Sequence, residues 1–525
     1  MRLGIDYGTT NTVVVCSDRG RYPVVLHMTE TAIGPVAREV FPSAVVYDRQ
    51  TGRLIFGADV ERCLCRPGAE EQYALIESPK RLMRDYAEGL RFRRDIRPEG
   101  FDAMTIVGEF AQALRESVLR SGLVPENEPL EAVITWPTNA NGAQRYVTRQ
   151  CFKKAGFDVL DALNEPSAAA IEFADRMNRG NRILARRFTA SAAIFDLGGG
   201  TFDAALVQIA EGNFRVVASG GVERLGGDDF DEILARRFAR EFGTTLEELP
   251  PFPRSLLLMR ARQIKENISS GAGRWLTLSA EDAGLSGGIA RVPVAEYFAD
   301  LSVLLEPALE KLHGLINGEA ARQAGITTET LVGIYLVGGS SKLPLVPHMI
   351  ARRFPGVRLI VSDKPFSSTA TGAAIHGAES VRLQDILSRN FGVMRLADYG
   401  RREYFAPVFK AGMPLPQRGA AALRSQVRYA PRHNIGHLRY LECAGLDSAG
   451  RPSEGVRAWS ELLFPYDPAI PIAQHLEPGM VRDREDLHDK WVCETYSCDS
   501  DGVITVSIQR LCDDQSRTYE VFQSQ

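Results

Sequence analysis

Short apolar runs recur along most of the chain, and glycine or proline follows each of them. Clear examples are Arg2–Ile5, Ala132–Thr135, Ala192–Phe195 and Gly333–Val337. Runs of this length, bounded by residues that form turns, are typical of strands buried in a sheet. The pattern therefore predicts a set of central strands spread over the chain.

Longer stretches between these runs carry apolar residues at helical spacing, for example Val107–Ser121 and Asp229–Phe242. Strands that alternate with amphipathic helices are typical of α/β architecture, in which the loops at strand ends hold ligands. We therefore expect an α/β fold with its functional residues in these loops.

The last part of the chain has a different pattern. Helical periodicity fades after Val381–Ser388, and Trp491–Cys498 and Val503–Gln509 alternate on either side of the turn sequence Asp499–Gly502. This arrangement predicts a β-hairpin. We place a domain boundary near residue 388, with an all-β domain after it, and we expect no helical segment after the last strand.

Two glycine-threonine turns, each with an aspartate before it, form an apparent duplication. In GIDYGTTNT, Asp6 comes before Gly8–Thr10, and in IFDLGGGTFD, Asp196 comes before Gly198–Thr201. Amides and hydroxyls of such turns can wrap a polyphosphate, and the carboxylate can hold hydrated magnesium. Either turn alone also fits a plain hairpin, but the repeated order favours two similar halves that face one ligand.

A third glycine pair, in Val337–Ser341, follows a predicted strand and precedes a helix that begins near Pro344. This position suits close approach of the backbone to a nucleoside. The pair carries little weight alone, but it fits beside the two phosphate turns.

The bulk composition narrows the class of protein. The chain has 525 residues, of which 44% are hydrophobic and 24% charged, and its formal net charge is −4. This charge disfavours nucleic-acid binding, which usually needs a basic surface. We find no secretory leader and no stretch approaching the roughly 20 apolar residues of a membrane span. The eight cysteines suggest reduced thiols, as in intracellular proteins. From charge, apolar runs and cysteines together, we expect a cytoplasmic protein without membrane or nucleic-acid partners.

Six motifs together resemble the 70-kDa heat-shock chaperone family: GIDYGTTNT, VITWP, NEPSAAAIEF, IFDLGGGTFD, RLGGDDFD and YLVGGSSKLP. They occur in the family's order and approximate spacing, and the likeness is strong through about residue 377. The resemblance implies an α/β, two-lobed, actin-like ATPase domain with duplicated ribonuclease-H-like halves, followed by a β-sandwich. We assign residues 1–384 to the ATPase domain, 385–390 to a linker and 391–525 to a substrate-binding-like domain without the helical lid.

The resemblance also implies roles for individual residues. The implied catalytic residues are Lys80, Glu165, Asp196 and Thr201, and the carboxylates implied to hold Mg²⁺ through water are Asp6, Glu165 and Asp196. A cation such as Lys80 beside the γ-phosphate suits phosphoryl transfer, although without the family context it would be taken for a surface lysine. Asp203 lies just beyond the second turn.

The contacts implied for ATP or ADP extend along much of the chain. They are Gly8, Thr9, Thr10, Asn11, Gly198, Gly199, Gly200, Thr201, Gly226, Gly227, Asp228, Lys265, Ser269, Gly338, Gly339, Ser340 and Lys342. Pro137 and Arg145 have the spacing of the family's proline switch and relay arginine, which would report the nucleotide state. By itself, Pro137 equally fits a proline that ends a strand.

Three features depart from the family. Arg262 replaces the usual glutamate near the ribose, and Asp161 replaces the arginine that docks J-domain cochaperones. The linker is reduced to Asp385–Ser388, which leaves less apolar surface for docking. Without a lid, a peptide would be held by strand addition and side-chain pockets alone.

The leading hypothesis is an ATP-dependent, chaperone-like protein in which hydrolysis modulates polypeptide binding, with a nucleotide-exchange factor as a possible further partner. One alternative is a nucleotide-dependent module for a single dedicated partner, which the short linker and Asp161 favour. Another is a small-molecule kinase of the actin-like superfamily, which would leave NEPSAAA and the β-domain unexplained. A filament-forming actin relative explains still less.

Overall fold

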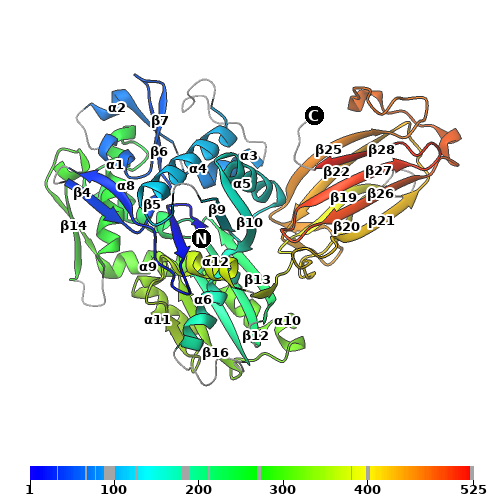
Figure 1. Ribbon diagram of the computed structural model, residues 1–525. Helices are drawn as coiled ribbons and strands as arrows, with labels where there is room; N and C mark the ends of the chain where they lie inside the picture. The colour runs from blue at the N-terminus through cyan, green and yellow to red at the C-terminus, as the bar shows by residue number, and fades with distance from the viewer. Residues whose placement is uncertain are drawn as a thin grey trace. The chain divides into compact units, whose positions relative to one another are not determined.

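The computed structural model describes residues 1–31, 34–64, 68–76, 78–87, 101–125, 128–179, 189–210, 213–268, 273–379, 381–397 and 402–520. The chain divides into two compact units (Figure 1). Unit 1 comprises Met1–Arg84, Arg91–Thr138 and Thr148–Arg382. Unit 2 comprises Asp85–Leu90, Asn139–Val147 and Leu383–Gln525.

Unit 1 is built around two sheets of the same topology. The strand order is β10-β9-β1-β2-β5 in the first sheet, and the corresponding five strands of the second, six-stranded sheet have the order β17-β16-β11-β12-β13. In each sheet an antiparallel hairpin, β1–β2 or β11–β12, is extended on one side by two parallel strands. The duplication seen in the two glycine-threonine turns therefore extends to five strands of each sheet, and the predicted α/β class is confirmed.

The first half of unit 1 holds these strands and helices: β1 (Arg2–Tyr7), β2 (Asn11–Ser17), β3 (His27–Thr31), β4 (Gly34–Arg38), β5 (Phe41–Pro42), β6 (Val45–Asp48), β7 (Arg53–Phe56), β8 (Tyr73–Ile76), β9 (Leu130–Trp136), β10 (Phe157–Asn164), α1 (Asp59–Leu64), α2 (Ala69–Gln72), α3 (Pro79–Ala87), α4 (Ala103–Arg120) and α6 (Glu165–Arg179). Helix α5 (Gly142–Lys154) contributes its first residues to unit 2 and the others to unit 1.

The second half holds β11 (Thr189–Leu197), β12 (Thr201–Ala210), β13 (Asn213–Glu223), β14 (Trp275–Ser279), β15 (Ile289–Pro293), β16 (Leu331–Val337), β17 (Leu359–Val361), α7 (Gly227–Glu241), α8 (Pro251–Glu266), α9 (Val294–Asn317), α10 (Glu319–Gln323), α11 (Leu345–Arg353), α12 (Ser368–Ala378) and the short 3₁₀ helices η1 (Glu281–Ala283) and η2 (Gly339–Lys342). The predicted helices Val107–Ser121 and Asp229–Phe242 correspond to α4 and α7, each within a few residues.

Helices α6 and α12 form a layer between the two sheets. α12 packs on β1, β2 and β9, α6 packs on β11 and β12, and the two helices pack on each other. A Cβ on Gly372 would overlap with the carbonyl oxygen of Ala168, so small residues are required at this crossing. The alanine-rich motif NEPSAAA thus serves close helix packing as well as the site at its N-terminal end.

Unit 2 contains a β-sandwich. Its sheets have the orders β20-β19-β22-β25 and β21-β26-β27-β28, and one apolar core fills the space between them. This confirms the all-β domain predicted from the alternating tail and the β-sandwich that the family resemblance implied. The elements are β19 (Asn390–Ala397), β20 (Arg402–Phe409), β21 (Leu423–Tyr429), β22 (Ile435–Cys443), β23 (Gly445–Leu446), β24 (Pro452–Glu454), β25 (Arg457–Pro465), η4 (Pro478–Met480), η5 (Glu485–Leu487), β26 (Val492–Cys498), β27 (Ile504–Arg510) and β28 (Ser516–Glu520).

The predicted C-terminal hairpin is β26–β27. Asp499 Oδ1 accepts hydrogen bonds from the amides of Asp501 and Val503, and Gly502 has a φ of +75°. The turn residues therefore act as their chemistry predicts, since an aspartate can accept backbone bonds and glycine tolerates positive φ.

The residues predicted as a linker belong to unit 2. Strand β18 (Arg382–Gln384) lies where the chain passes from unit 1 to unit 2. Beyond it, the Leu387 amide donates to the Met413 carbonyl at 2.8 Å, and the Leu415 amide donates to the Asp385 carbonyl at 2.8 Å. Leu387 is also a member of the sandwich core.

Reduced cysteines and the lack of a membrane-spanning stretch are two further expectations from the sequence. The described cysteines are free thiols, and all except Cys512 are buried. Among the described residues, no helix combines the length and the apolarity that crossing a bilayer requires.

Candidate active site

A cavity of about 1080 Å³ lies between the two halves of unit 1. Nearly all residues singled out from the sequence line it. They are Asp6, Gly8, Thr9, Thr10, Asn11, Lys80, Glu165, Asp196, Gly198, Gly199, Gly200, Thr201, Gly227, Asp228, Lys265, Gly338, Gly339, Ser340 and Lys342. The fold therefore brings residues from the full length of unit 1 to one cavity.

The two glycine-threonine turns face each other across this cavity. A Cβ on Gly199 would overlap with Thr10 Oγ1, and a Cβ on Gly200 would lie 2.7 Å from Thr9 Cγ2. Glycine is required at positions 199 and 200 because any side chain there would collide with the opposite turn. Ordering these glycines loses conformational entropy, but it allows the backbones of the two turns to lie close together.

The second turn is held by its own half of the unit. The Gly227 amide donates to the Gly198 carbonyl at 3.0 Å, and the Asp228 amide donates to the Gly199 carbonyl at 2.7 Å. Ser340 Oγ also donates to the Gly198 carbonyl, at 2.7 Å. Because the carbonyls are held in this way, the position of the turn is fixed by α7 and by the third glycine pair.

The first turn is held by hydroxyl groups that sequence reasoning did not find. Ser43 Oγ donates to the Gly8 carbonyl at 2.8 Å, and Ser78 Oγ donates to the Thr9 carbonyl. Both phosphate-type turns are therefore preorganised before any ligand binds.

Four carboxylates gather behind the turns, and their electrostatics are unusual. Burial, reinforced by the negative charge of Glu165, raises the pKa of Asp6 and of Asp203 to about 7. The same two causes raise the pKa of Asp196, with Asp6 and Asp203 adding to the effect. Burial is the larger cause, and repulsion among the carboxylates adds to it, so the charged form of each group is disfavoured at this position.

Lys80 is the cation within this group. Its Nζ lies 2.6 Å from Glu165 Oε1, and both side chains are largely buried. Burial opposes the charged form of Lys80, but Glu165 and Asp6 outweigh it and raise the pKa of the amine. Lys80 therefore carries a positive charge next to the cavity at neutral pH.

The carboxylates suit a hydrated divalent cation more than one bound directly. No group of three or more His, Cys, Asp or Glu side chains in the described part of the chain is arranged to hold a metal directly. Each of the four carboxylates already accepts a hydrogen bond: Asp6 from Thr135 Oγ1 at 3.0 Å and Asp196 from Thr369 Oγ1 at 3.3 Å, Glu165 from Lys80 and Asp203 from the Thr138 amide. Hard oxygen donors gathered in this way fit Mg²⁺ held through its waters.

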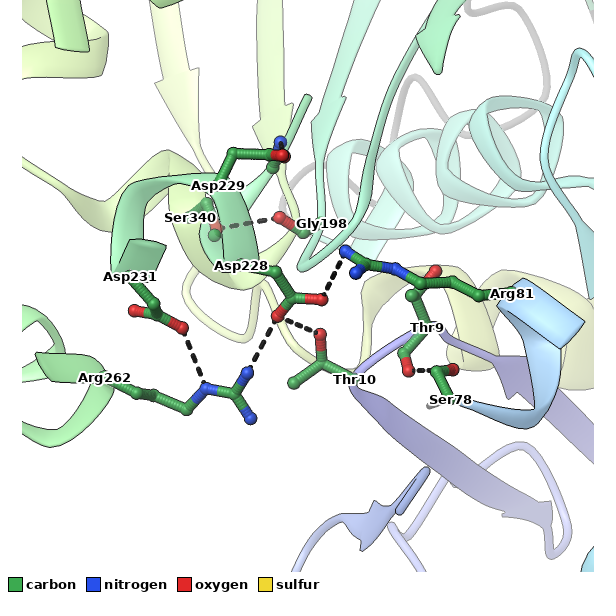
Figure 2. Close-up of polar contacts among 12 residues, drawn as sticks. Thr9, Thr10, Ser78, Arg81, Gly198, Asp228, Asp229, Asp231, Arg262 and Ser340 are labelled. Atoms are coloured by element: carbon green, nitrogen blue, oxygen red, sulfur yellow. Dashed lines mark hydrogen bonds and ion pairs between the residues drawn. The ribbon is translucent and has the colours of Figure 1, made fainter. Parts of the chain in front are cut away.

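Asp228 connects the two halves at the edge of the cavity (Figure 2). It accepts hydrogen bonds from Thr10 Oγ1 at 2.9 Å, from Arg81 Nη2 at 2.8 Å and from Arg262 Nη2 at 2.9 Å. The Nε of Arg262 donates to Asp231 at 2.9 Å. The arginine that replaces the family's glutamate is thus held by two carboxylates, which keeps its pKa above its usual range.

Lys265 belongs to the same polar group. Its Nζ lies 2.8 Å from Asp231 Oδ1 and donates to the Gly227 carbonyl at 2.7 Å. On the other side of the cavity, Lys342 Nζ lies 4.7 Å from the centroid of the Phe366 ring. Gly226, although not part of the lining, contacts Gly199 so closely that a Cβ would lie 2.5 Å from the Gly199 carbonyl oxygen.

Three of the residues singled out lie elsewhere or are not described. Ser269 is outside the described residues. Pro137 follows β9, and the next amide, that of Thr138, donates to Asp203 Oδ1 at 2.8 Å. Arg145 belongs to unit 2, where it donates to the Asp501 carbonyl at 3.1 Å and to Ser388 Oγ at 3.2 Å.

Several lining residues were missed from the sequence, namely Ser43, Ser78, Arg81, Phe366 and Thr369. Ser78 and Arg81 could have been found, because both stand beside Lys80 in the segment SPKRLMR. Ser43, Phe366 and Thr369 stand in segments without a recognisable motif, so no local signal marked them.

The sequence of this chain is similar to those of known proteins. The model of the family described as Hsp70 protein matches residues 2–389. The chain is 31% identical over 415 residues to a chaperone protein HscA homolog of Burkholderia lata, covering 75% of this chain and 59% of that protein. It is 30% identical over 424 residues to a chaperone protein HscA homolog of Burkholderia mallei, covering 75% of this chain and 62% of that protein. The matched region thus spans about three-fifths of the length of these relatives.

Proposed function

Because this chain belongs to the Hsp70 family, we propose that it is an ATP-dependent, chaperone-like protein. Unit 1 binds and hydrolyses ATP, and the β-sandwich of residues 391–525 binds polypeptide under the control of the nucleotide. The residues assigned to ATP, to catalysis and to signalling keep the roles that the family resemblance implies.

One observation carries the proposal: two preorganised Asp–Gly–Thr turns face each other, with the Lys80–Glu165 pair beside them. Residues Gly8–Thr10 and Gly198–Thr201 line one cavity from the two halves of unit 1. A polyphosphate is the ligand class that such opposed turns accommodate, because it accepts hydrogen bonds in all directions. The cavity volume of about 1080 Å³ leaves room for a nucleoside as well.

In the proposed reaction, water attacks the γ-phosphate in line with the bond to ADP. Lys80 stabilises the charge that develops on the phosphoryl oxygens, and Glu165 holds the Lys80 amine in position at 2.6 Å. Thr201 orients the water or the γ-phosphate by hydrogen bonding. Asp6, Glu165 and Asp196 would hold the waters of Mg²⁺, which when bound neutralises phosphate charge.

The test is a Lys80→Ala variant, assayed for ADP and ATP binding and for phosphate release. We expect nucleotide affinity to stay within a few fold, while hydrolysis falls by about 10²- to 10³-fold, as for loss of one electrostatic contact. Lys153→Ala is a matched control, since Lys153 is an exposed lysine on α5. Unchanged phosphate release in Lys80→Ala would remove this lysine from the mechanism. Phosphate transferred to a sugar or polyol instead of water would favour a kinase.

A second candidate is a nucleotide-dependent module for one dedicated partner, and one contact favours it. Asp161, which stands where the family has a J-domain-docking arginine, lies 2.9 Å from His376 Nε2 through its Oδ2. Both side chains are only about 15% exposed. A carboxylate in this pair offers neither the positive charge nor the free side chain of the arginine that docks J-domain cochaperones in the family, so we propose that J-domain recruitment through this position is lost.

Pull-down with the full chain in ADP and in ATP separates the two candidates. Many unfolded polypeptides retained in a nucleotide-dependent way would support a general chaperone. A single folded protein retained in one nucleotide state would support the dedicated module. A nucleotide-exchange factor is a further proposed partner, recognised by faster ADP release in its presence.

A further inference from the structure

Phe366 differs from the other aromatic residues around the cavity of unit 1. Among the described lining residues, Phe230 is fully buried and Phe252 packs against an apolar cluster, whereas Phe366 is 40% exposed. A large aromatic ring that is partly exposed on a cavity wall gives a ligand apolar surface to cover. Its position therefore suits a ligand with a flat or apolar part.

The backbone holds Phe366 beside the third glycine pair. The Gly338 amide donates to the Pro365 carbonyl at 3.0 Å, so the residue before Phe366 is tied to the turn. A Cβ on Gly339 would overlap with Cε1 of the Phe366 ring, so the turn backbone lies directly against the ring. The ring is thus placed by main-chain contacts rather than by its own side-chain freedom.

The turn that contains the third glycine pair, Gly338 and Gly339, also contacts the second glycine-threonine turn, Gly198–Thr201. Ser340 Oγ donates to the Gly198 carbonyl at 2.7 Å, while Gly339 contacts Phe366. The glycine pair therefore separates the residues proposed to hold phosphate from the aromatic ring. A nucleotide has the same order of parts, with phosphates, then ribose, then a flat base.

A charged group lies over the Phe366 ring. Lys342 Nζ lies 4.7 Å from the ring centroid, within the range of a cation–π contact. Because Lys342 is exposed and its stem is flexible, it can move aside and cover a base from the far side. Nucleobases stack on aromatic side chains with little preference for sequence, since every base has a π face.

We propose that Phe366 is the stacking surface for the nucleobase and sets the preference of this cavity for nucleoside phosphates over bare polyphosphate. This inference rests on the proposed nucleotide-binding function. The proposed class of ligand is a nucleoside di- or triphosphate, and the expected contact is between the base and one face of the ring, with Lys342 beside it.

The test compares ADP and inorganic tripolyphosphate as ligands of the full chain by calorimetry, in the wild type and in Phe366→Ala. We expect Phe366→Ala to bind ADP about 5- to 150-fold more weakly, the range for loss of one base–aromatic stack. Tripolyphosphate, which has no base, should bind both proteins equally. Phe366→Trp should retain ADP binding, and Trp275→Ala, which removes an exposed aromatic residue outside the cavity, should change neither ligand.

The outcomes are distinct. Unchanged ADP affinity in Phe366→Ala would overturn the stacking role and leave the proposed function standing. If Phe366→Ala loses both ligands equally, as through a general folding defect, the Phe366→Leu variant decides, because it keeps an apolar side chain without a π face. Phe366→Leu should lose ADP selectively, and no loss or an equal loss in this variant would overturn the stacking role. A wild type that binds neither ligand would overturn the proposed function and this inference together.

Discussion

Arg81 and Asp228 form an ion pair that joins the two halves of unit 1. Arg81 Nη2 lies 2.8 Å from Asp228 Oδ2, and the two residues come from α3 and α7 (Figure 2). Asp228 is also tied to Arg262 on α8 and to Thr10 in the first turn. If the two halves moved apart to open the cavity, this ion pair would therefore have to break.

Removal of this pair should make nucleotide leave faster. For Arg81→Ala we expect the dissociation rate of ADP to rise about 2- to 10-fold, or about 0.4–1.4 kcal/mol, because a partly buried ion pair contributes at or slightly above the upper end of the 0–1 kcal/mol typical of exposed pairs. Stopped-flow release of a fluorescent ADP analogue measures this rate. Arg236→Ala, which removes an exposed pair with Glu232 on α7, is the control. Identical release rates in both variants would show that the Arg81 contact does not restrain the cavity.

The short segment Asp385–Ser388 should resist proteolysis in every nucleotide state. The amide and carbonyl of Leu387 are bonded to the backbone of Met413 and Gly412, and Ile386 and Leu387 are buried. Limited digestion with thermolysin in ADP and in ATP, followed by mass spectrometry, tests this. Trypsin cleavage in the exposed turn at Arg418 serves as the positive control. Cleavage at Leu387 in one nucleotide state alone would show that the segment leaves its pairing during the cycle.

The buried ion pair in the β-sandwich should be costly to break. Arg395 Nη2 lies 2.6 Å from Glu494 Oε2, Glu494 is fully buried, and the hydroxyls of Tyr429 and Tyr496 donate to its carboxylate. Glu494→Ala would leave the Arg395 charge without its partner, so we expect a loss of about 3–5 kcal/mol in the free energy of unfolding.

Urea unfolding of the full chain measures this loss, and Glu461→Ala is the matched control. Glu461 pairs with His437 at 3.3 Å but its side chain is 62% exposed, so its removal should cost about 0–1 kcal/mol. A Glu494→Ala protein as stable as the control would mean that the Arg395 side chain escapes to water when its partner is removed.

His27 should make unit 1 less stable in mild acid. Burial, and to a smaller extent the charge of Arg120, lowers the pKa of its imidazole to about 4. Between pH 6.5 and 4 the unfolded chain binds a proton that the folded chain does not, so stability falls as the pH falls through this window. The expected contribution is about 3 kcal/mol when complete.

The measurement is urea unfolding at a series of pH values between about 7.5 and 4, for the wild type and for His27→Gln. The glutamine side chain of this variant can still pair with Ser117 Oγ, which lies 2.8 Å from His27 Nδ1 in the wild type. Every other titrating group is common to the two proteins, so the difference between their pH slopes isolates His27. Parallel slopes would contradict the predicted shift.

The strands and the paired turns could be predicted because their signals are local. An apolar run followed by Asp, Gly and Thr encodes both the strand and the chemistry at its end, and this holds for Asp6 and for Asp196. The roles of Lys80 and Glu165 needed the family resemblance, because a lysine in a basic helix and a glutamate before an alanine run have no distinctive pattern of their own. The 2.6 Å contact between them became visible only in the fold.

By itself, the sequence determined the α/β class, the β-rich tail and the two opposed glycine-threonine turns, since strand periodicity and turn chemistry act between near neighbours. Only the tertiary structure decided that Asp228 joins Arg81 to Arg262, that Thr369 bonds Asp196, and that Phe366 lies against Gly339. Thr369 and Asp196 are 173 residues apart, and nothing in the local pattern of either records the other. Such contacts arise because two duplicated sheets pack about the same pair of helices, which brings distant loops to one cavity.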